Sequence, residues 1–168
     1  MAEAIKKLKV GLIGCGRVSV MHLVSIAALK ETELVACCDI KKERADETAK
    51  KYAAKAYYSY EEMLDSENLD AVHICLPHYL HSKVACYAFE KGVHVLTEKP
   101  MDVDLQSAEN AVAKAKATMA QAMLSSLFIK IECYAFCDYL SKSNKYSLNR
   151  TLYVDNICIW GYFMNLKI

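Results

Sequence analysis

Residues 11–19 read GLIGCGRVS, and this stretch decides the fold. It begins within an apolar run, residues 9–13, and leads into residues 18–30, where apolar side chains recur at helical spacing. A buried strand followed at once by a glycine-rich turn and a helix is the usual opening of a βαβ unit. The stretch therefore predicts an α/β domain that starts with a strand, a tight turn and a helix.

The two glycines of this turn, together with the residues after them, predict a phosphate-binding site. Gly14 permits the tight turn, and Gly16 lets backbone N–H groups approach a pyrophosphate because no Cβ stands in the way. The helix that follows at Arg17 and Val18 adds unpaired N–H donors and the positive end of its dipole. The third glycine position of the pattern holds Ser19, which is small but not glycine. An ordinary strand-to-helix turn is the alternative interpretation.

An acidic residue follows the next strand at about the spacing that a dinucleotide site requires. The apolar run 34–38 predicts the second strand, and Asp39 ends it. A carboxylate here can accept hydrogen bonds from both hydroxyls of an adenosine ribose, and it repels a 2′-phosphate, so it favours NAD over NADP. Lys41 and Lys42 lie close by and leave NADP as an alternative. Asp39 also fits the N-cap of a helix over residues 41–52, and one residue can serve both purposes.

The same alternation of strands and helices continues up to residue 117. Strands that read as continuous apolar runs indicate a parallel sheet covered on both faces. The sequence therefore predicts an α/β doubly wound parallel sheet, a Rossmann fold, as the domain over residues 1–117. Further strands are expected at residues 56–58, 71–76 and 93–96, further helices at residues 82–90 and 105–117, and a helix start at Ser59, with Glu62 completing a capping box.

Composition and charge narrow the functional classes. The 168 residues carry a formal net charge of +1, with 54% hydrophobic and 24% charged residues, which is typical of a globular protein rather than a nucleic-acid binder. We find neither a signal peptide nor an apolar run long enough to span a membrane, so we expect a cytoplasmic protein. The eight cysteines then predict reduced thiols. Cys133, Cys137 and Cys158 have poor spacing for zinc, and no metal site is expected.

Three linked motifs resemble one family of oxidoreductases. Residues 92–100 read GVHVLTEKP and residues 76–81 read LPHYLH, so they contain a Glu-Lys-Pro motif and a Pro-x-x-x-His turn. The turn at residues 14–16, with His22 on the helix after it, is the third motif. Together they are similar to the Gfo/Idh/MocA family, which is the glucose–fructose oxidoreductase, inositol dehydrogenase and rhizopine-catabolism group. The resemblance runs in uninterrupted order over residues 8–117.

The resemblance implies roles for individual residues at the carboxyl ends of the strands. Lys99 is the implied catalytic residue, which would contact the reacting hydroxyl or carbonyl beside the nicotinamide, where a cation stabilises a developing alkoxide. Glu98 would orient Lys99, and a cis bond between Lys99 and Pro100 would hold the lysine toward the cofactor. Pro77 and His81 would line the cofactor cleft, although His81 could instead start the next helix. We interpret the other histidines of this region as structural, namely His73, His78 and His94.

Residues 118–168 differ in character from the rest of the chain. They contain one glycine and no proline, and they are rich in tyrosine, asparagine, isoleucine, leucine and cysteine. Residues 127–131 could add one strand, but no further periodicity follows. The family's C-terminal substrate domain, with its acid–base histidine, is expected to be missing or truncated, because the last histidine is His94. The segment is either a divergent extension or the product of an altered reading frame.

The residues leave two functions open. The first is the NAD(P)-binding half of an oxidoreductase that transfers a hydride between the nicotinamide and a secondary alcohol of a sugar or cyclitol. The second is a non-catalytic module, or a truncated remnant, that binds NAD(H) without turnover. A methyltransferase with a similar glycine loop is disfavoured by the Glu98-Lys99-Pro100 motif. The sequence does not decide the substrate, the activity of the chain alone or whether it forms a homo-oligomer.

Overall fold

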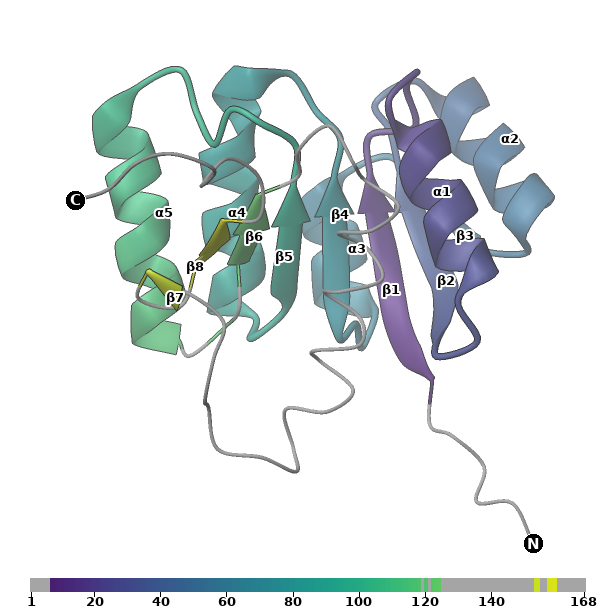
Figure 1. The fold of residues 1–168 in the computed structure, drawn as a ribbon. Helices are drawn as coiled ribbons and strands as arrows, with labels where there is room; N and C mark the ends of the chain where they lie inside the picture. The colour runs from purple at the N-terminus through teal and green to yellow at the C-terminus, as the bar shows by residue number, and fades with distance from the viewer. Residues whose placement is uncertain (1–6, 119, 121, 125–152, 155–156, 160–168) are drawn as a thin grey trace, which may run out of the picture.

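The computed structural model describes residues 7–118, 120, 122–124, 153–154 and 157–159. Their strands form one sheet in the order β3-β2-β1-β4-β5-β6-β8-β7. Neighbouring strands run parallel, except for β7 and β8, which are antiparallel. Figure 1 shows helices on both sides of this sheet. The predicted α/β doubly wound parallel sheet is therefore confirmed.

The elements up to residue 118 lie within two residues of their expected bounds. A short 3₁₀ turn, which the sequence did not indicate, precedes the fourth helix. The strands are β1 (Leu8–Ile13), β2 (Thr32–Cys38), β3 (Lys55–Tyr57), β4 (Ala71–Ile74), β5 (His94–Thr97), β6 (Ala122–Leu124), β7 (Tyr153–Val154) and β8 (Ile157–Ile159). The helices are α1 (Ser19–Ala28), α2 (Lys42–Tyr52), α3 (Tyr60–Ser66), η1 (His78–Leu80), α4 (His81–Glu90) and α5 (Leu105–Thr118).

Apolar side chains form two clusters of buried residues. In the larger cluster, Met63 of α3, Phe89 of α4 and Ala115 of α5 pack against the strands. In the smaller cluster, Leu23 of α1 and Ala49 of α2 pack with residues of β1 and β2. Buried strands that contribute to both clusters must be apolar on both faces, which explains their continuous apolar runs.

The order of the strands brings three turns to one edge of the sheet. The chain runs from β1 outward to β2 and β3, and it then returns to β4 on the other side of β1. In open α/β sheets, ligands bind outside the carboxyl ends of the strands at such a reversal. The turns that follow Ile13, Ile74 and Thr97 all lie at this edge, because their strands are parallel neighbours.

Two helix ends show how local sequence controls the elements. Ser59 caps α3 as expected, since its Oγ accepts the N–H of Glu62 at 3.3 Å. The same hydroxyl donates to a carboxylate oxygen of Glu61 at 2.6 Å. The acidic side chain that contacts the Ser59 hydroxyl is therefore that of Glu61, not that of Glu62, which was expected to complete a capping box. Helix α2 ends at Ala53, which adopts a left-handed conformation with φ of 55° although it is not a glycine.

The sheet continues beyond residue 117. Strand β6 pairs in parallel with β5, and β8 pairs in parallel with β6. The strand expected at residues 127–131 lies outside the described residues, and the domain boundary at residue 117 stays a prediction. Within the part of the chain that the structure describes, no helix combines the length and apolarity needed to cross a bilayer.

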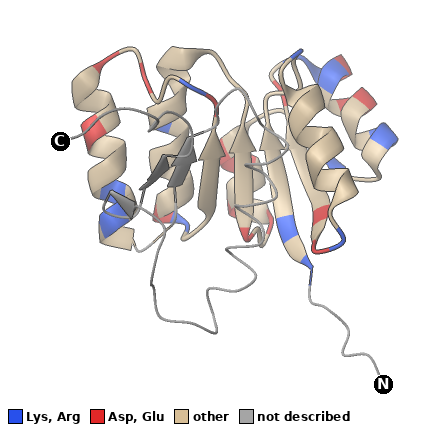
Figure 2. Cartoon of the chain, in the orientation of Figure 1, with Lys and Arg blue, Asp and Glu red and all other residues tan. Residues whose placement is uncertain are grey.

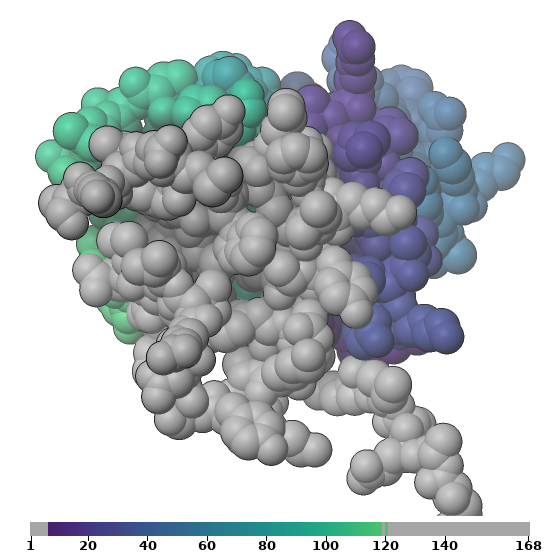
Figure 3. All heavy atoms as spheres, in the orientation of Figure 1, coloured from purple at the N-terminus to yellow at the C-terminus, as the bar shows by residue number. Residues whose placement is uncertain are grey.

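The surface carries charges of both signs and one apolar helix face. Figure 2 colours basic and acidic residues along α2, and on α5 it shows an acidic residue followed by basic residues near the end of the helix, in keeping with the net charge of +1. Helix α1 lies at one side of the face shown in Figure 3. Its outward side chains Val20, Met21 and Val24 are about half exposed. The apolar pattern of α1 therefore overstates how much of the helix is buried.

Candidate functional site

The turn after β1 depends on a glycine at position 14. Gly14 has φ of +94°, and its N–H donates to the Cys38 carbonyl oxygen at 2.8 Å. A Cβ on Gly14 would lie 2.4 Å from the Cys75 carbonyl oxygen, which is far too close. Gly16 differs, because a Cβ there would meet no atom within 4 Å. The first glycine thus makes the tight turn, and the second leaves open space above the backbone.

The N-terminus of α1 opens directly beyond Gly16. Ser19, at the third glycine position, is buried, and its Oγ donates to the Gly16 carbonyl at 2.6 Å. The N-cap residue Val18 makes no side-chain cap hydrogen bond, and the first turn of α1 contains no acidic residue. Arg17 and Val18 are both exposed. The first N–H groups of α1 and its positive dipole end are therefore suited to an anion.

Asp39 connects the glycine turn to the start of α2. It is 8% exposed, and its Oδ2 accepts the N–H of Cys15 at 2.9 Å. Its Oδ1 accepts the N–H of Lys41 at 2.8 Å. The N-cap position of α2 belongs to Lys41, so the interpretation of Asp39 as the N-cap is wrong. Each carboxylate oxygen keeps a second lone pair, and ribose binding by Asp39 stays a prediction.

The turn after β5 presents a lysine at the same edge of the sheet. Lys99 and Pro100 are exposed, and the peptide bond between them is cis, as the resemblance implies. The Glu98 side chain is only 13% exposed. Its Oε2 accepts the backbone N–H of Lys99 at 3.3 Å, and the backbone N–H of Glu98 donates to the Ile74 carbonyl at 3.0 Å. Glu98 thus contacts the backbone of Lys99, while its role in orienting Lys99 stays a prediction.

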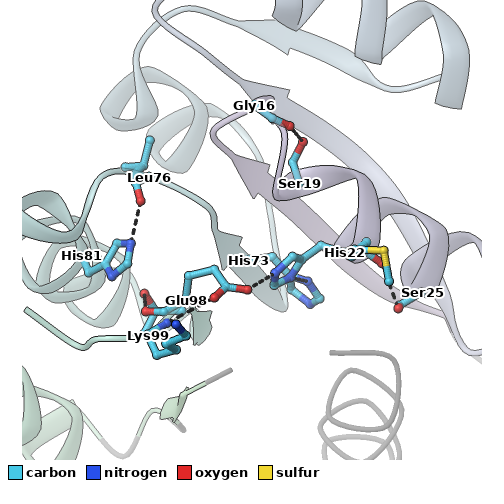
Figure 4. Close-up of polar contacts among 11 residues, drawn as sticks. Gly16, Ser19, His22, Ser25, His73, Leu76, His81, Glu98 and Lys99 are labelled. Atoms are coloured by element: carbon cyan, nitrogen blue, oxygen red, sulfur yellow. Dashed lines mark hydrogen bonds and ion pairs between the residues drawn. The ribbon is translucent and has the colours of Figure 1, made fainter. Parts of the chain in front are cut away.

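Two buried histidines approach this turn from different elements (Figure 4). His22 of α1 has no exposed surface, and its Nε2 lies 2.9 Å from Oε1 of Glu98. Its Nδ1 lies 3.1 Å from Nδ1 of His73, a fully buried residue of β4. Burial, and then the proximity of His22, holds the pKa of His73 well below 6.5. His73 is therefore a buried, neutral residue, and it belongs to a polar chain that the sequence did not reveal.

His81 joins two backbone segments at the edge of the site. It begins α4 and is fully buried. Its Nδ1 lies 2.7 Å from the Pro100 carbonyl oxygen, and its Nε2 lies 2.7 Å from that of Leu76. Pro77, next to this contact, is exposed. The His81 ring thus links the turns after β4 and β5, while a direct contact with a cofactor stays a prediction.

The described cysteines are free thiols. Cys15, Cys37, Cys38, Cys75 and Cys86 form no disulfide. Burial raises the pKa of Cys38 to about 12, so this thiol stays protonated at neutral pH. Among the residues that the structure describes, no group of histidine, cysteine and acidic residues is arranged to hold a metal ion. Cys133 and Cys137 lie outside those residues.

These features together define a class of protein. A parallel sheet reverses its strand order beside a glycine turn, which opens into a helix N-terminus. A carboxylate follows β2, and a lysine follows β5 at the same edge. This is the arrangement of a dinucleotide-binding Rossmann domain.

Comparison with known proteins identifies the family. The sequence model described as "Oxidoreductase family, NAD-binding Rossmann fold", of Gfo/Idh/MocA proteins, matches residues 8–126. The chain belongs to this family. Glucose-6-phosphate 3-dehydrogenase of Bacillus subtilis (strain 168) is 31% identical over 100 residues, which are 60% of this chain and 28% of that protein. Myo-inositol 2-dehydrogenase of Thermotoga maritima is 27% identical over 110 residues, or 65% of this chain and 33% of that one.

Solved structures agree with this assignment. The WlbA dehydrogenase from Bordetella pertussis, in complex with NADH and UDP-GlcNAcA, superposes with a TM-score of 0.70 and 30% identity. The match covers 71% of this chain and 35% of that one. Myo-inositol 2-dehydrogenase from Lactobacillus plantarum gives a TM-score of 0.68 and 25% identity over 71% of this chain and 36% of that one. The chain thus spans about a third of the length of the relatives it matches.

Proposed function

We propose that this chain is the cofactor-binding part of an NAD(P)-dependent oxidoreductase that acts on a secondary alcohol of a sugar or cyclitol. One observation carries the proposal. The open space above Gly16, at the N-terminus of α1, lies at the same edge of the sheet as the exposed Lys99. A dinucleotide laid along this edge has its phosphates at the helix and its reactive ring near the lysine.

The glycine turn supports binding of the pyrophosphate. Backbone N–H groups at Gly16, Arg17 and Val18 can approach a phosphate because no Cβ fills the space above Gly16. The exposed Arg17 side chain adds a positive charge at the same place. The residues present therefore fit a dinucleotide.

Asp39 supports a preference for NAD over NADP. Its carboxylate is fixed by the N–H groups of Cys15 and Lys41, so it is held at the end of β2 in one orientation. A fixed carboxylate can accept hydrogen bonds from ribose hydroxyls and repels a 2′-phosphate. The exposed Lys41 and Lys42 weaken that repulsion, which leaves NADP as a second cofactor.

Lys99 is the residue to which we assign the chemistry. The bound nicotinamide accepts or supplies the hydride. The Lys99 ammonium stabilises negative charge on the oxygen of the reacting alcohol and can take part in moving its proton. Glu98 holds the backbone of Lys99, and Pro77 and His81 shape the adjoining turn.

The relatives of this chain support its substrate class, and its cysteines support a cytoplasmic location. A glucose-6-phosphate 3-dehydrogenase and a myo-inositol 2-dehydrogenase are among the proteins that this chain resembles, so we assign a sugar or cyclitol as substrate. The free thiols of the described residues agree with a reducing, cytoplasmic compartment.

A titration of the purified chain with NADH and with NADPH, followed by nicotinamide fluorescence, tests the proposal. We expect saturable binding of NADH that is tighter than binding of NADPH. Asp39→Ala should weaken NADH binding and reduce the preference, whereas Lys99→Ala should leave the NADH affinity within about twofold, since Lys99 acts on the substrate. If the cooperatively folded protein bound neither dinucleotide, the proposed function would be wrong for this chain.

A further inference from the structure

A buried chain of three polar side chains connects α1 to the Lys99 turn. His73 lies on β4, His22 lies on α1, and Glu98 follows β5. The two Nδ1 atoms of the histidines are 3.1 Å apart, and Nε2 of His22 is 2.9 Å from Oε1 of Glu98. The imidazole rings meet edge to face, with their centroids 5.2 Å apart. Figure 4 shows the rings of His22 and His73 close together, with a dashed line to Glu98 and with Lys99 beside Glu98.

The hydrogen-bonding capacity of these groups fixes where the protons lie. An ionised carboxylate only accepts, so Nε2 of His22 must carry the hydrogen that Glu98 receives. Burial keeps His73 neutral, because its pKa is held well below 6.5. When His22 is also neutral, its Nδ1 accepts the Nδ1–H of His73. The chain then runs in one direction, from His73 through His22 to Glu98.

The second carboxylate oxygen of Glu98 contacts the backbone of Lys99. Oε1 is bound by His22, and Oε2 accepts the backbone N–H of Lys99 at 3.3 Å. The carboxylate is thus held at both oxygens, and its contact with Lys99 cannot rotate away without breaking the contact with His22. Lys99 itself is exposed, and this contact ties its backbone to the Glu98 carboxylate.

We propose that His22 is a positioning residue for Lys99, which it holds through Glu98 at a fixed place relative to helix α1. The inference rests on the proposed function, which gives Lys99 its place beside the nicotinamide. Helix α1 carries the phosphate-binding turn at its first residues and His22 one turn later. One helix therefore sets both ends of the dinucleotide site. Hydride transfer requires such alignment, because small displacements of the reacting groups cost much of the rate.

Two substitutions at His22 separate positioning from simple packing. His22→Phe keeps a buried ring but removes both polar contacts. His22→Gln keeps a side-chain N–H near the place of Nε2, so it can still donate to Glu98. If His22 acts through that bond, the Gln variant should preserve the Lys99 turn and the Phe variant should release it.

Hydrogen exchange of single backbone amides in the full chain measures this effect. We expect His22→Phe to speed exchange of the Lys99 amide at least tenfold, and His22→Gln to change it less than threefold. The matched control is the Gly92 amide, which bonds to the Phe89 carbonyl at 2.9 Å away from this chain of residues. It should keep its rate in both variants. Equal acceleration of both amides in His22→Phe, or equal rates for the Lys99 amide in all proteins, would overturn the proposal.

A second measurement needs no variant. Long-range ¹H–¹⁵N correlation spectra of the histidine side chains in the wild-type chain should show His22 protonated at Nε2. A His22 that carried its proton at Nδ1 alone could not donate to Glu98, and that result would also overturn the proposal. NADH titration of the same samples tests the proposed function separately. Protected Lys99 amides without NADH binding would reject the function alone, and NADH binding without protection would reject the positioning role alone.

Discussion

Gly14→Ala should destabilise the protein severely, because the position demands a glycine twice over. The backbone has φ of +94°, where an L-residue costs about 1–2 kcal/mol or more. The new methyl group would also lie 2.4 Å from the Cys75 carbonyl oxygen and 2.8 Å from its carbon, which are backbone atoms that move only with β4. Such overpacking adds about 1–3 kcal/mol. We therefore expect the free energy of unfolding to fall by about 2–5 kcal/mol.

Gly16→Ala provides the matched control two residues away. Its Cβ meets nothing within 4 Å, so stability should change by no more than about 0.5 kcal/mol. The methyl group would instead occupy the space that we assign to the pyrophosphate, and NADH affinity should fall at least tenfold, about 1.4 kcal/mol. Urea unfolding monitored by circular dichroism, with NADH titration of the folded variants, measures both effects. A Gly14→Ala protein that unfolds at the wild-type urea concentration would show that the turn does not require a glycine at position 14.

Three further substitutions or treatments have definite outcomes. The folded state keeps His73 unprotonated below pH 6.5, whereas the unfolded chain takes up the proton. The free energy of unfolding should therefore fall as the pH drops below 6.5, by up to about 1.4 kcal/mol per pH unit. His73→Asn should flatten that slope in urea titrations. Phe89→Ala should cost about 3–5 kcal/mol, since Phe89 is 2% exposed within the larger cluster, whereas Val103→Ala, at a 68% exposed position, should cost almost nothing in the same assay. Cys38, with a pKa of about 12, should resist iodoacetamide at pH 8 in the folded protein and react in urea, as peptide mass spectrometry can show; rapid labelling in the folded state would contradict its burial.

The sequence predicted the part of the fold that depends on neighbouring residues. Apolar runs and glycine turns are local signals, and they located the strands and helices up to residue 118 within two residues. Gly14 could be assigned to the tight turn because it lies between a strand and a helix, and its positive φ agrees with that assignment. Ala53 shows the limit of such signals, since it ends α2 in a left-handed conformation without a glycine to announce it. Likewise, the three-residue strand β6 was too short to be recognised by its pattern.

The candidate site was predictable only in part, because its contacts join distant residues. His22 and Glu98 are 76 positions apart, and His22 and His73 are 51 apart, so no spacing rule connects them. The buried ring of His81 lies 2.7 Å from the carbonyl oxygens of both Leu76 and Pro100, and the place of His81 in the sequence did not indicate these contacts. Only the three-dimensional order of β1, β4 and β5 brings these groups together.

We propose that NADH binds along the carboxyl edge of the sheet, from the glycine turn to Lys99. The most direct test follows backbone amide resonances of the isotopically labelled chain during an NADH titration. We expect saturating shifts at Gly14, Gly16, Asp39 and Lys99, and none at Lys114 of α5, which pairs with Glu90 of α4. Shifts confined to residues away from that edge, or no shifts at saturating NADH, would contradict it.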